Sequence, residues 1–294
     1  MPPSSSTSLS GASTPLGDPP TSPLPTTEPS PNSNASSTKP PGDPSRRQSI
    51  WTRTHLTTEI TLEHADIPII ACCFVSGLCD SSSYNAWNCF VSMQTGNTIF
   101  LALGASGQPI SRPYGWLRSL TSIAFFLLGC LFFAWSRFIR PKTRGTLAAS
   151  FFLQSVCIVI AAALVECDIV PSPHGLVPSD ALDFMELVPL AFLAFQSGGQ
   201  IVTSRILGFN EVPTTVLTSV YCDIASDPRI LARDNVKRNR RVAAVVCILI
   251  GGIAGGWISR SAAGLSTNFW IAAAIKMGIG LGWLVWKPKP MIAL

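Results

Sequence analysis

Long apolar segments alternate with short polar segments along the chain after about residue 60. The apolar runs lie near residues 65–105, 117–138, 147–166, 185–208, 241–259 and 266–286. Most of them reach the roughly 20 residues that a helix needs to cross the hydrocarbon core of a membrane. The pattern predicts an all-α integral membrane protein with six transmembrane crossings.

The first and fourth apolar runs are too long for simple crossings. Residues 65–105 and 187–226 each extend over about twice a membrane thickness at the helical rise. A polar interruption divides each run: CDSSSYNAWN (residues 79–88) in the first and LGFNEVPTT (residues 207–215) in the fourth. We predict that each run contains a helix, a break, and a short half-helix or re-entrant piece.

The two broken runs also resemble each other. FVSG, beginning at Phe74, is matched by FQSG at Phe195, and MQTGNTIFLAL, beginning at Met93, is matched by VLTSVYCDIAS at Val216. Two further crossings follow each run. Three crossings in each half would give the halves opposite orientations in the membrane, as in the inverted repeats of many secondary transporters. The sequence therefore favours a 3+3 inverted repeat with broken first and fourth helices.

Composition supports lipid as the solvent and divides the chain in two. Hydrophobic residues make up 47% of the chain and charged residues only 13%, which is unusual for a soluble domain. Residues 1–49, however, are dominated by Pro, Ser, Thr, Gly and Asn, and bury too little apolar surface to offset the entropy of ordering. We predict a disordered cytoplasmic tail over residues 1–60 and a multi-pass transmembrane domain over residues 61–294.

The tail carries two further features. No basic segment leads into a short apolar segment near residue 1, so no cleaved secretory signal is expected. RRQS, from Arg46 to Ser49, resembles a site for a basic-directed kinase. Such four-residue matches also occur by chance in disordered segments, and phosphorylation is left open.

Lysine and arginine are concentrated in alternate connections between the crossings. They occur at residues 46–53, 137–144, 229–241 and 287–289, whereas residues 166–186 contain five acidic residues and neither Lys nor Arg. Cytoplasmic connections keep positive charge, so both termini are predicted to be cytoplasmic. The net charge of +5 is not gathered on a face with aromatic residues, so the expected partners are membrane lipids and not nucleic acid.

Few residues suit catalysis or metal binding. The nine cysteines form no CxxC pair, the three histidines lie outside the apolar runs, and HExxH, GxSxG and a phosphate-binding glycine loop are all absent from the sequence. We expect no enzymatic activity, no cofactor and no metal site. An intramembrane hydrolase that uses Asp80 is the remaining enzymatic alternative.

Two ionisable residues lie inside apolar runs. Asp80 is in the first run and Lys276 lies ten residues into the sixth, and such residues are costly near the bilayer centre and often functional. Ser76 and Tyr84 share a helical face with Asp80. Asp80 is the candidate partner of Lys276, either in a pair that senses a proton or an ion or in a static pair that fixes helix packing; whether the two residues pair is left open.

Polar residues of both breaks complete a candidate site near the midplane. MQTGNT, from Met93 to Thr98, places hydrogen-bonding side chains and a glycine together, and irregular backbone in lipid is tolerated only against protein or a cavity. A capped helix end at the interface is the structural alternative. The predicted solute-binding residues are Asp80, Tyr84, Gln94, Thr95, Asn97, Gln200, Thr215, Thr218 and Lys276.

These motifs resemble those of the YoaK-like transmembrane proteins, a family with a domain of unknown function found in bacteria and fungi. The resemblance extends from about Asp66 to Trp286 and rests on SGLCDSSSY followed by MQTGNT, and on FQSGGQ followed by VPTTVLTSVYCDIAS. Where family members often carry a second Thr-Gly, this chain has Thr218 and Ser219. The resemblance implies a multi-pass membrane protein and no particular substrate.

The resulting functional hypothesis is binding or transport of a small solute at the midplane site. The alternative is a non-transporting membrane scaffold or accessory subunit in which the same polar residues only hold helices together. Small residues at four-residue spacing support close helix packing within the fold or a homo-oligomer; they are Gly251, Gly252, Gly255, Gly256, Gly278 and Gly282.

Overall fold

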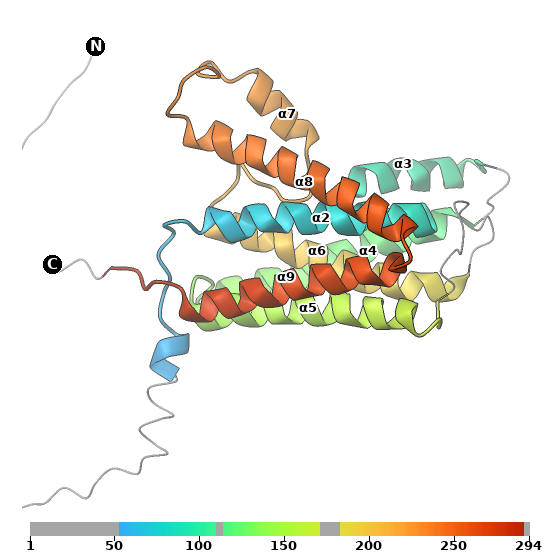
Figure 1. Ribbon diagram of the computed structural model, residues 1–294, viewed down its shortest axis with the longest axis horizontal. Helices are drawn as coiled ribbons and strands as arrows, with labels where there is room; N and C mark the ends of the chain where they lie inside the picture. The colour runs from blue at the N-terminus through green and yellow to red at the C-terminus, as the bar shows by residue number, and fades with distance from the viewer. Residues whose placement is uncertain (1–52, 110–113, 171–182, 291–294) are drawn as a thin grey trace, which may run out of the picture. The chain divides into compact units, whose positions relative to one another are not determined.

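The computed structural model describes residues 53–109, 114–170 and 183–290, all within one compact unit, Asp43–Leu294. These residues form helices and, apart from two isolated bridges, no β-structure (Figure 1). The predicted tail lies, up to residue 52, outside the described residues. The elements are α2 (Asp66–Trp87), α3 (Gln94–Ala105), α4 (Trp116–Ala134), η1 (Trp135–Phe138), α5 (Arg144–Glu166), η2 (Phe184–Glu186), α6 (Leu187–Leu207), α7 (Thr218–Ala225), α8 (Val236–Arg260) and α9 (Gly264–Val285).

Six helices of the described residues are long and apolar enough to cross a membrane, and each corresponds to one predicted crossing. The six spans are α2, α4 together with η1, α5, η2 together with α6, α8, and α9. The prediction of an all-α protein with six crossings is confirmed. The chain is therefore a multi-pass membrane protein.

Helix pairing follows the two halves of the sequence. α2 of the first half packs along α8 of the second, α4 packs along α6, and α5 packs along α9. The repeat makes α2, α4 and α5 of the first half equivalent to α6, α8 and α9 of the second. Exchanging equivalent helices turns the α2–α8 pair into the α6–α4 pair and leaves the α5–α9 pair unchanged. The contacts thus have the approximate two-fold relationship that the predicted repeat requires.

Close approaches at glycine repeat this relationship in detail. A Cβ atom on Gly251 of α8 would lie 2.2 Å from the backbone oxygen of Phe74, and one on Gly129 of α4 would lie 2.1 Å from the backbone oxygen of Phe195. Phe74 and Phe195 begin the matching FVSG and FQSG motifs. Only glycine allows backbones to approach so closely. The two crossings α2/α8 and α6/α4 are therefore built in the same way.

The other glycines of the predicted packing motifs differ in their surroundings. Gly255 also faces α2, because a Cβ there would lie 2.9 Å from the backbone oxygen of Leu78. Around Gly256, Gly278 and Gly282 no heavy atom of the described residues lies within 4 Å of such a Cβ. Gly251 and Gly255 thus serve packing within the fold, as predicted.

Segments predicted to be on the same side of the membrane meet at one end of the bundle. The backbone N–H of Ile60 donates to the oxygen of Lys142 (3.0 Å), and that of Lys289 donates to the oxygen of Glu59 (2.8 Å). The Arg144 side chain also donates to the oxygen of Trp286. Residues 53–60, which the sequence assigns to the tail, thus contact the helical domain where the basic connections lie.

Both long apolar runs are broken, but the first breaks later than predicted. The helix α2 continues through Cys79–Trp87 and ends at Asn88, whose φ of 52° is left-handed. The break is residues 88–93, and the segment that begins at Gln94 is the start of α3. The second break lies as predicted, because α6 ends at Gly208 (φ 92°) and α7 begins at Thr218.

The predicted interruption stays helical because its serines bond to the helix that carries them. The hydroxyls of Ser81 and Ser82 donate to the backbone oxygen of Leu78, at 3.2 and 2.7 Å, and that of Ser83 donates to the oxygen of Asp80. Such local bonds satisfy hydroxyl groups in an apolar setting without ending the helix. A polar run was therefore mistaken for a break.

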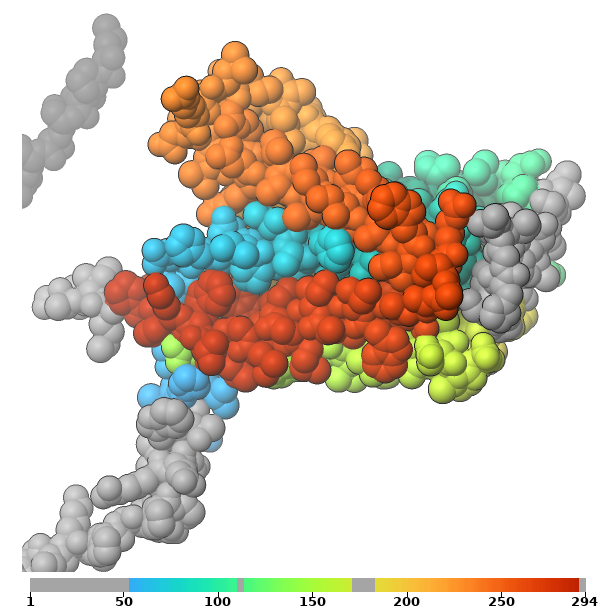
Figure 2. Space-filling view, viewed as in Figure 1, coloured from blue at the N-terminus to red at the C-terminus, as the bar shows by residue number. Residues whose placement is uncertain are grey.

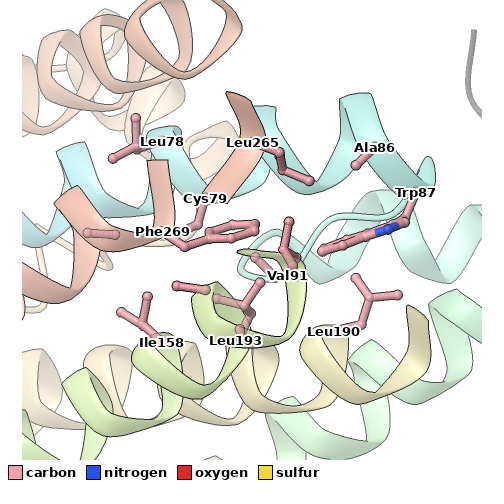
Figure 3. Packing of buried hydrophobic residues seen from close by; sticks show 14 of the residues in the cluster. Leu78, Cys79, Ala86, Trp87, Val91, Ile158, Leu190, Leu193, Leu265 and Phe269 are labelled. Carbon is pink, nitrogen blue, oxygen red and sulfur yellow. The ribbon is translucent and has the colours of Figure 1, made fainter. Parts of the chain in front are cut away.

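A hydrophobic core fills the bundle on the side of the first break (Figure 3). Trp87 stacks on Phe269 of α9 with ring centroids 6.1 Å apart, and Val91 from the break packs in the same cluster. The face of the bundle seen in Figure 2 is formed partly by α8 and α9. On α8, large apolar side chains such as Leu249 and Trp257 are exposed and not part of the core. Those side chains suit contact with lipid.

Candidate functional site

Lys276 lies at the centre of the described bundle with no exposed surface. Its Nζ donates to Oε1 of Gln154 at 2.7 Å and to Oε1 of Gln200 at 2.5 Å, and it lies 5.2 Å from the ring centroid of Phe151. Among the described residues no carboxylate lies within 4.0 Å of this nitrogen. The ammonium group is therefore held by neutral oxygens and an aromatic face.

The network around Lys276 joins four helices. Nε2 of Gln200 on α6 donates to the hydroxyl of Ser76 on α2 (2.7 Å) and to the backbone oxygen of Cys72 (3.1 Å). On α5, Nε2 of Gln154 donates to the hydroxyl of Ser150 (3.1 Å). Because each amide is bonded at both ends, the orientation of its oxygen toward Lys276 is fixed. We call Ser76, Gln154, Gln200 and Lys276 the central cluster.

Asp80 does not belong to this cluster, and the candidate Asp80–Lys276 pair does not form, because the two side chains have different partners. Its Oδ1 accepts the backbone N–H groups of Val91 and Ser92, both at 2.8 Å, and its Oδ2 accepts the hydroxyl of Ser92 at 2.5 Å. Because of these bonds, residues 91 and 92 of the break lie beside Asp80, which is two helical turns before the end of α2. The carboxylate is needed to hold re-entrant backbone, which otherwise would have unsatisfied N–H groups in lipid.

Asn97 and Gln94 fix the other side of the same break. Asn97 is fully buried; its Oδ1 accepts the N–H of Phe90 (3.1 Å) and its Nδ2 donates to the oxygen of Phe90 (2.7 Å) and to Oε1 of Gln94 (2.8 Å). Gln94 also donates to the hydroxyl of Ser122 on α4 (3.1 Å). We call Asp80, Ser92, Gln94 and Asn97 the break cluster.

The other predicted site residues lie elsewhere. Tyr84 is 40% exposed and stacks on Phe90, with ring centroids 4.7 Å apart. Thr95 is exposed on α3, and Thr218 is exposed at the start of α7. Thr215 is buried in the second break, where its N–H donates to the oxygen of Pro213 at 2.8 Å. The nine predicted residues therefore do not form one site.

The sequence reading missed several buried polar side chains, among them Gln154, Arg118 and Glu186. Gln154 is a lone amide in an apolar run. It is as far from Lys276 in the sequence as Gly129 is from Gly251, so the two residues occupy equivalent positions in the two halves. Arg118 and Glu186 form a buried ion pair, with Nη2 and Oε2 2.6 Å apart. Glu186 had been counted among the acidic residues of the connection 166–186. The repeat spacing could have revealed Gln154, whereas a lone Arg at a helix start gives no such signal.

Comparison with known proteins gives a family and no activity. A family model described as "Protein of unknown function (DUF1275)" matches residues 69–282. The chain belongs to this family. No curated protein and no solved structure matches it. In this DUF1275 member, the matched range contains both the central cluster and the break cluster.

The chemistry that the two clusters offer is hydrogen bonding and compensation of charge. Among residues 53–109, 114–170 and 183–290, no group of three or more His, Cys, Asp or Glu side chains is placed to hold a metal ion. The central cluster presents an ammonium group and amides, which bind anionic or polar groups. The break cluster has its donors and acceptors engaged with the backbone of the break.

Proposed function

We propose that this protein binds a small polar solute at the central cluster and carries it across the membrane without catalysing a chemical step. The observation that carries this proposal is the burial of Lys276 without a carboxylate partner. A charged group inside a membrane costs several kcal/mol. Satisfying helix packing alone would not require a charge at this position, because a leucine or methionine would fill the space.

The arrangement of helices supports transport over simple binding. The central cluster lies where the helices of the two halves meet, as solute sites do in transporters built from inverted repeats. The break after α2 returns into the bundle, and α3 starts at that depth. Paired broken helices of this kind accompany the solute site in such transporters.

A non-transporting scaffold is the second candidate, and the break cluster favours it. The side chains of Asp80 and Asn97 form hydrogen bonds with the backbone of residues 90–92. Two of the predicted solute-binding residues therefore have structural roles. In a scaffold the central cluster would likewise only fix the register of four helices. The experiment below distinguishes the two.

The orientation and the finer family assignment are part of the same proposal. The basic connections meet at one end of the bundle, and the positive-inside rule places that end in the cytoplasm together with both termini. The motifs at Asp80 and Met93 support assignment to the YoaK-like transmembrane proteins that the sequence resembles. Membrane lipids surround the helices in this proposal.

A thermal-stability screen of the purified protein in detergent tests the proposal. Amino acids, sugars, nucleobases, organic acids and metal ions are added separately to the wild type, Lys276→Met and Ser155→Ala. Ser155 is a matched control because its hydroxyl joins α5 to α9 by donating to the oxygen of Ala273 (2.8 Å), outside the cluster.

A ligand at about 100 times its dissociation constant adds roughly 2.7 kcal/mol to the native state. We expect one chemical class to stabilise the wild type and Ser155→Ala but not Lys276→Met. If no class stabilises the wild type, or if the same class stabilises all three proteins, the central cluster is not a solute site and the scaffold role is favoured.

A further inference from the structure

A pocket of about 330 Å³ opens where α2 ends, α3 passes and α4 begins. Its walls include the rings of Tyr84, Trp87, Phe100 and Trp116. This is the end of the bundle away from residues 53–61 and 286–289, which contact the starts of α5 and the end of α9. The pocket is therefore separate from the central cluster and lies near the opposite end of the bundle.

α3 is fixed against the start of α4 at this pocket. A Cβ atom on Gly104 would lie 2.2 Å from Cβ of Trp116, so the two helices approach as closely as their atoms allow. Tyr84 is stacked on Phe90, and Phe100 is stacked on both of these rings at 6.3 Å. The aromatic walls are thus held in place by packing and do not need a ligand to position them.

Two side chains of the pocket have N–H donors that are not used. Trp87 is 1% exposed, and neither its Nε1 nor the Nδ2 of Asn88 has a hydrogen-bond partner in the described part of the protein. Leaving a buried donor unpaired costs about 1–3 kcal/mol. Buried donors of this kind call for a partner such as water, an ion or a bound molecule, and the adjacent pocket has room for one.

The charged residue of the pocket is already neutralised. Arg118 forms its ion pair with Glu186 at 2.6 Å, with both side chains less than 5% exposed. A bound anion would compete with that carboxylate, and a bound cation would face the guanidinium group. The pocket therefore suits a molecule without net charge.

We propose that this pocket binds a planar, uncharged ring compound that carries carbonyl or ring-nitrogen acceptors. The acceptors take hydrogen bonds from the indole N–H of Trp87 and the amide of Asn88. The rings of Tyr84, Phe100 and Trp116 enclose the flat body, since stacked aromatic contacts favour such a shape. This site does not depend on transport through the central cluster.

Equilibrium dialysis with coumarin and naphthalene tests the inference. Both probes are flat, uncharged two-ring compounds, but only coumarin has a carbonyl acceptor. The purified protein in detergent is compared with empty micelles, so that partition into detergent is subtracted. We expect saturable binding of coumarin at one site and at least tenfold weaker binding of naphthalene.

Variants connect this binding to the two donors. Trp87→Phe removes the indole N–H and keeps a ring, and Asn88→Gly removes the amide at a left-handed position that glycine accepts (φ 52°). Each is expected to weaken coumarin binding about five- to tenfold, the effect of one hydrogen bond. Trp257→Phe, on the exposed face of α8, is the matched control and should bind as the wild type does.

Three results would overturn the inference. They are the absence of saturable coumarin binding, equal binding of the two probes, and unchanged coumarin affinity in both Trp87→Phe and Asn88→Gly. The last would mean that water satisfies the donors. Lys276→Met is expected to bind coumarin normally, so failure of the proposed transport function would leave this measurement unaffected.

Discussion

Lys276 donates a 2.7 Å hydrogen bond to Gln154, and the two residues occupy corresponding positions in the two halves of the chain. Their helices, α9 and α5, are the pair that exchange of the halves leaves unchanged. Residues related in this way meet at the axis between the halves. Because one half supplies the ammonium group and the other an amide, the centre of an otherwise repeated structure is chemically asymmetric.

This relationship predicts strong coupling between Lys276 and Gln154 and none between Lys276 and Asp80. Lys276→Met leaves the oxygens of Gln154 and Gln200 buried and unpaired, so we expect destabilisation of about 1–3 kcal/mol. In double-mutant cycles, Lys276→Met with Gln154→Leu should show an interaction free energy of about 1 kcal/mol or more. Unfolding in mixed micelles measures these values.

Asp80→Asn provides the comparison in the same experiment. Combined with Lys276→Met, it should be additive within about 0.5 kcal/mol, because the two side chains share no hydrogen-bond partner. A larger interaction free energy between Asp80 and Lys276 than between Gln154 and Lys276 would contradict the structure.

Asp80 should control the stability of the break after α2. Asp80→Ala removes the acceptor of three hydrogen bonds, from the backbone and hydroxyl groups of Val91 and Ser92. We expect a loss of roughly 2–4 kcal/mol and faster hydrogen exchange of the amides of residues 90–93, measured by mass spectrometry. Asp223→Ala removes an exposed carboxylate that pairs with Arg241 and should change neither quantity appreciably. Unchanged exchange in Asp80→Ala would show that the carboxylate does not hold the break.

The repeated glycine contacts should be equally sensitive to substitution. Gly129→Ala and Gly251→Ala each place a methyl group within 2.2 Å of a backbone oxygen of the facing helix, so the helices must separate. Overpacking of this kind typically costs about 1–3 kcal/mol, and we expect similar losses of thermal stability for both. Gly256→Ala has no neighbouring atom of the described residues to displace and should be neutral or stabilising. A large effect at only one of the first two positions would argue against equivalent crossings.

The proposed orientation predicts which segments are glycosylated in a eukaryotic host. An acceptor introduced between Val170 and Asp180, in the connection that lacks Lys and Arg, should be modified, whereas the native Asn34-Ala35-Ser36 should not. Gel mobility with and without glycosidase reports both. The opposite pattern would reverse the topology.

The hydrophobic pattern predicted the crossings because lipid imposes the simplest rule on sequence: about 20 apolar residues for each span. The repeat was also visible, since FVSG and FQSG place Phe74 and Phe195 at equivalent close contacts. The position of the first break was not visible, because Ser81 and Ser82 are equally compatible with a loop and with bonding back to the helix oxygens. Composition alone does not distinguish the two.

The candidate site was predicted only in part. Gln200 and Lys276 do meet, but Asp80 was paired with Lys276 on the argument that two buried charges should cancel. That argument overlooked the backbone N–H groups of residues 91 and 92, which offer a carboxylate equivalent compensation. It also overlooked Gln154, because an uncharged amide in an apolar run attracts less attention than a charge.

Access of water-borne molecules to the central cluster is the most direct test of the proposed transport site. Ser76→Cys, in a background without native cysteines, places a thiol beside Gln200. A charged, membrane-impermeant thiosulfonate reagent is then applied to the folded protein, with Ala272→Cys in the apolar core as the control. We predict that the thiol at position 76 reacts and that the one at position 272 does not. If neither reacts until the protein is denatured, no path leads to Lys276 and the proposed transport function is wrong.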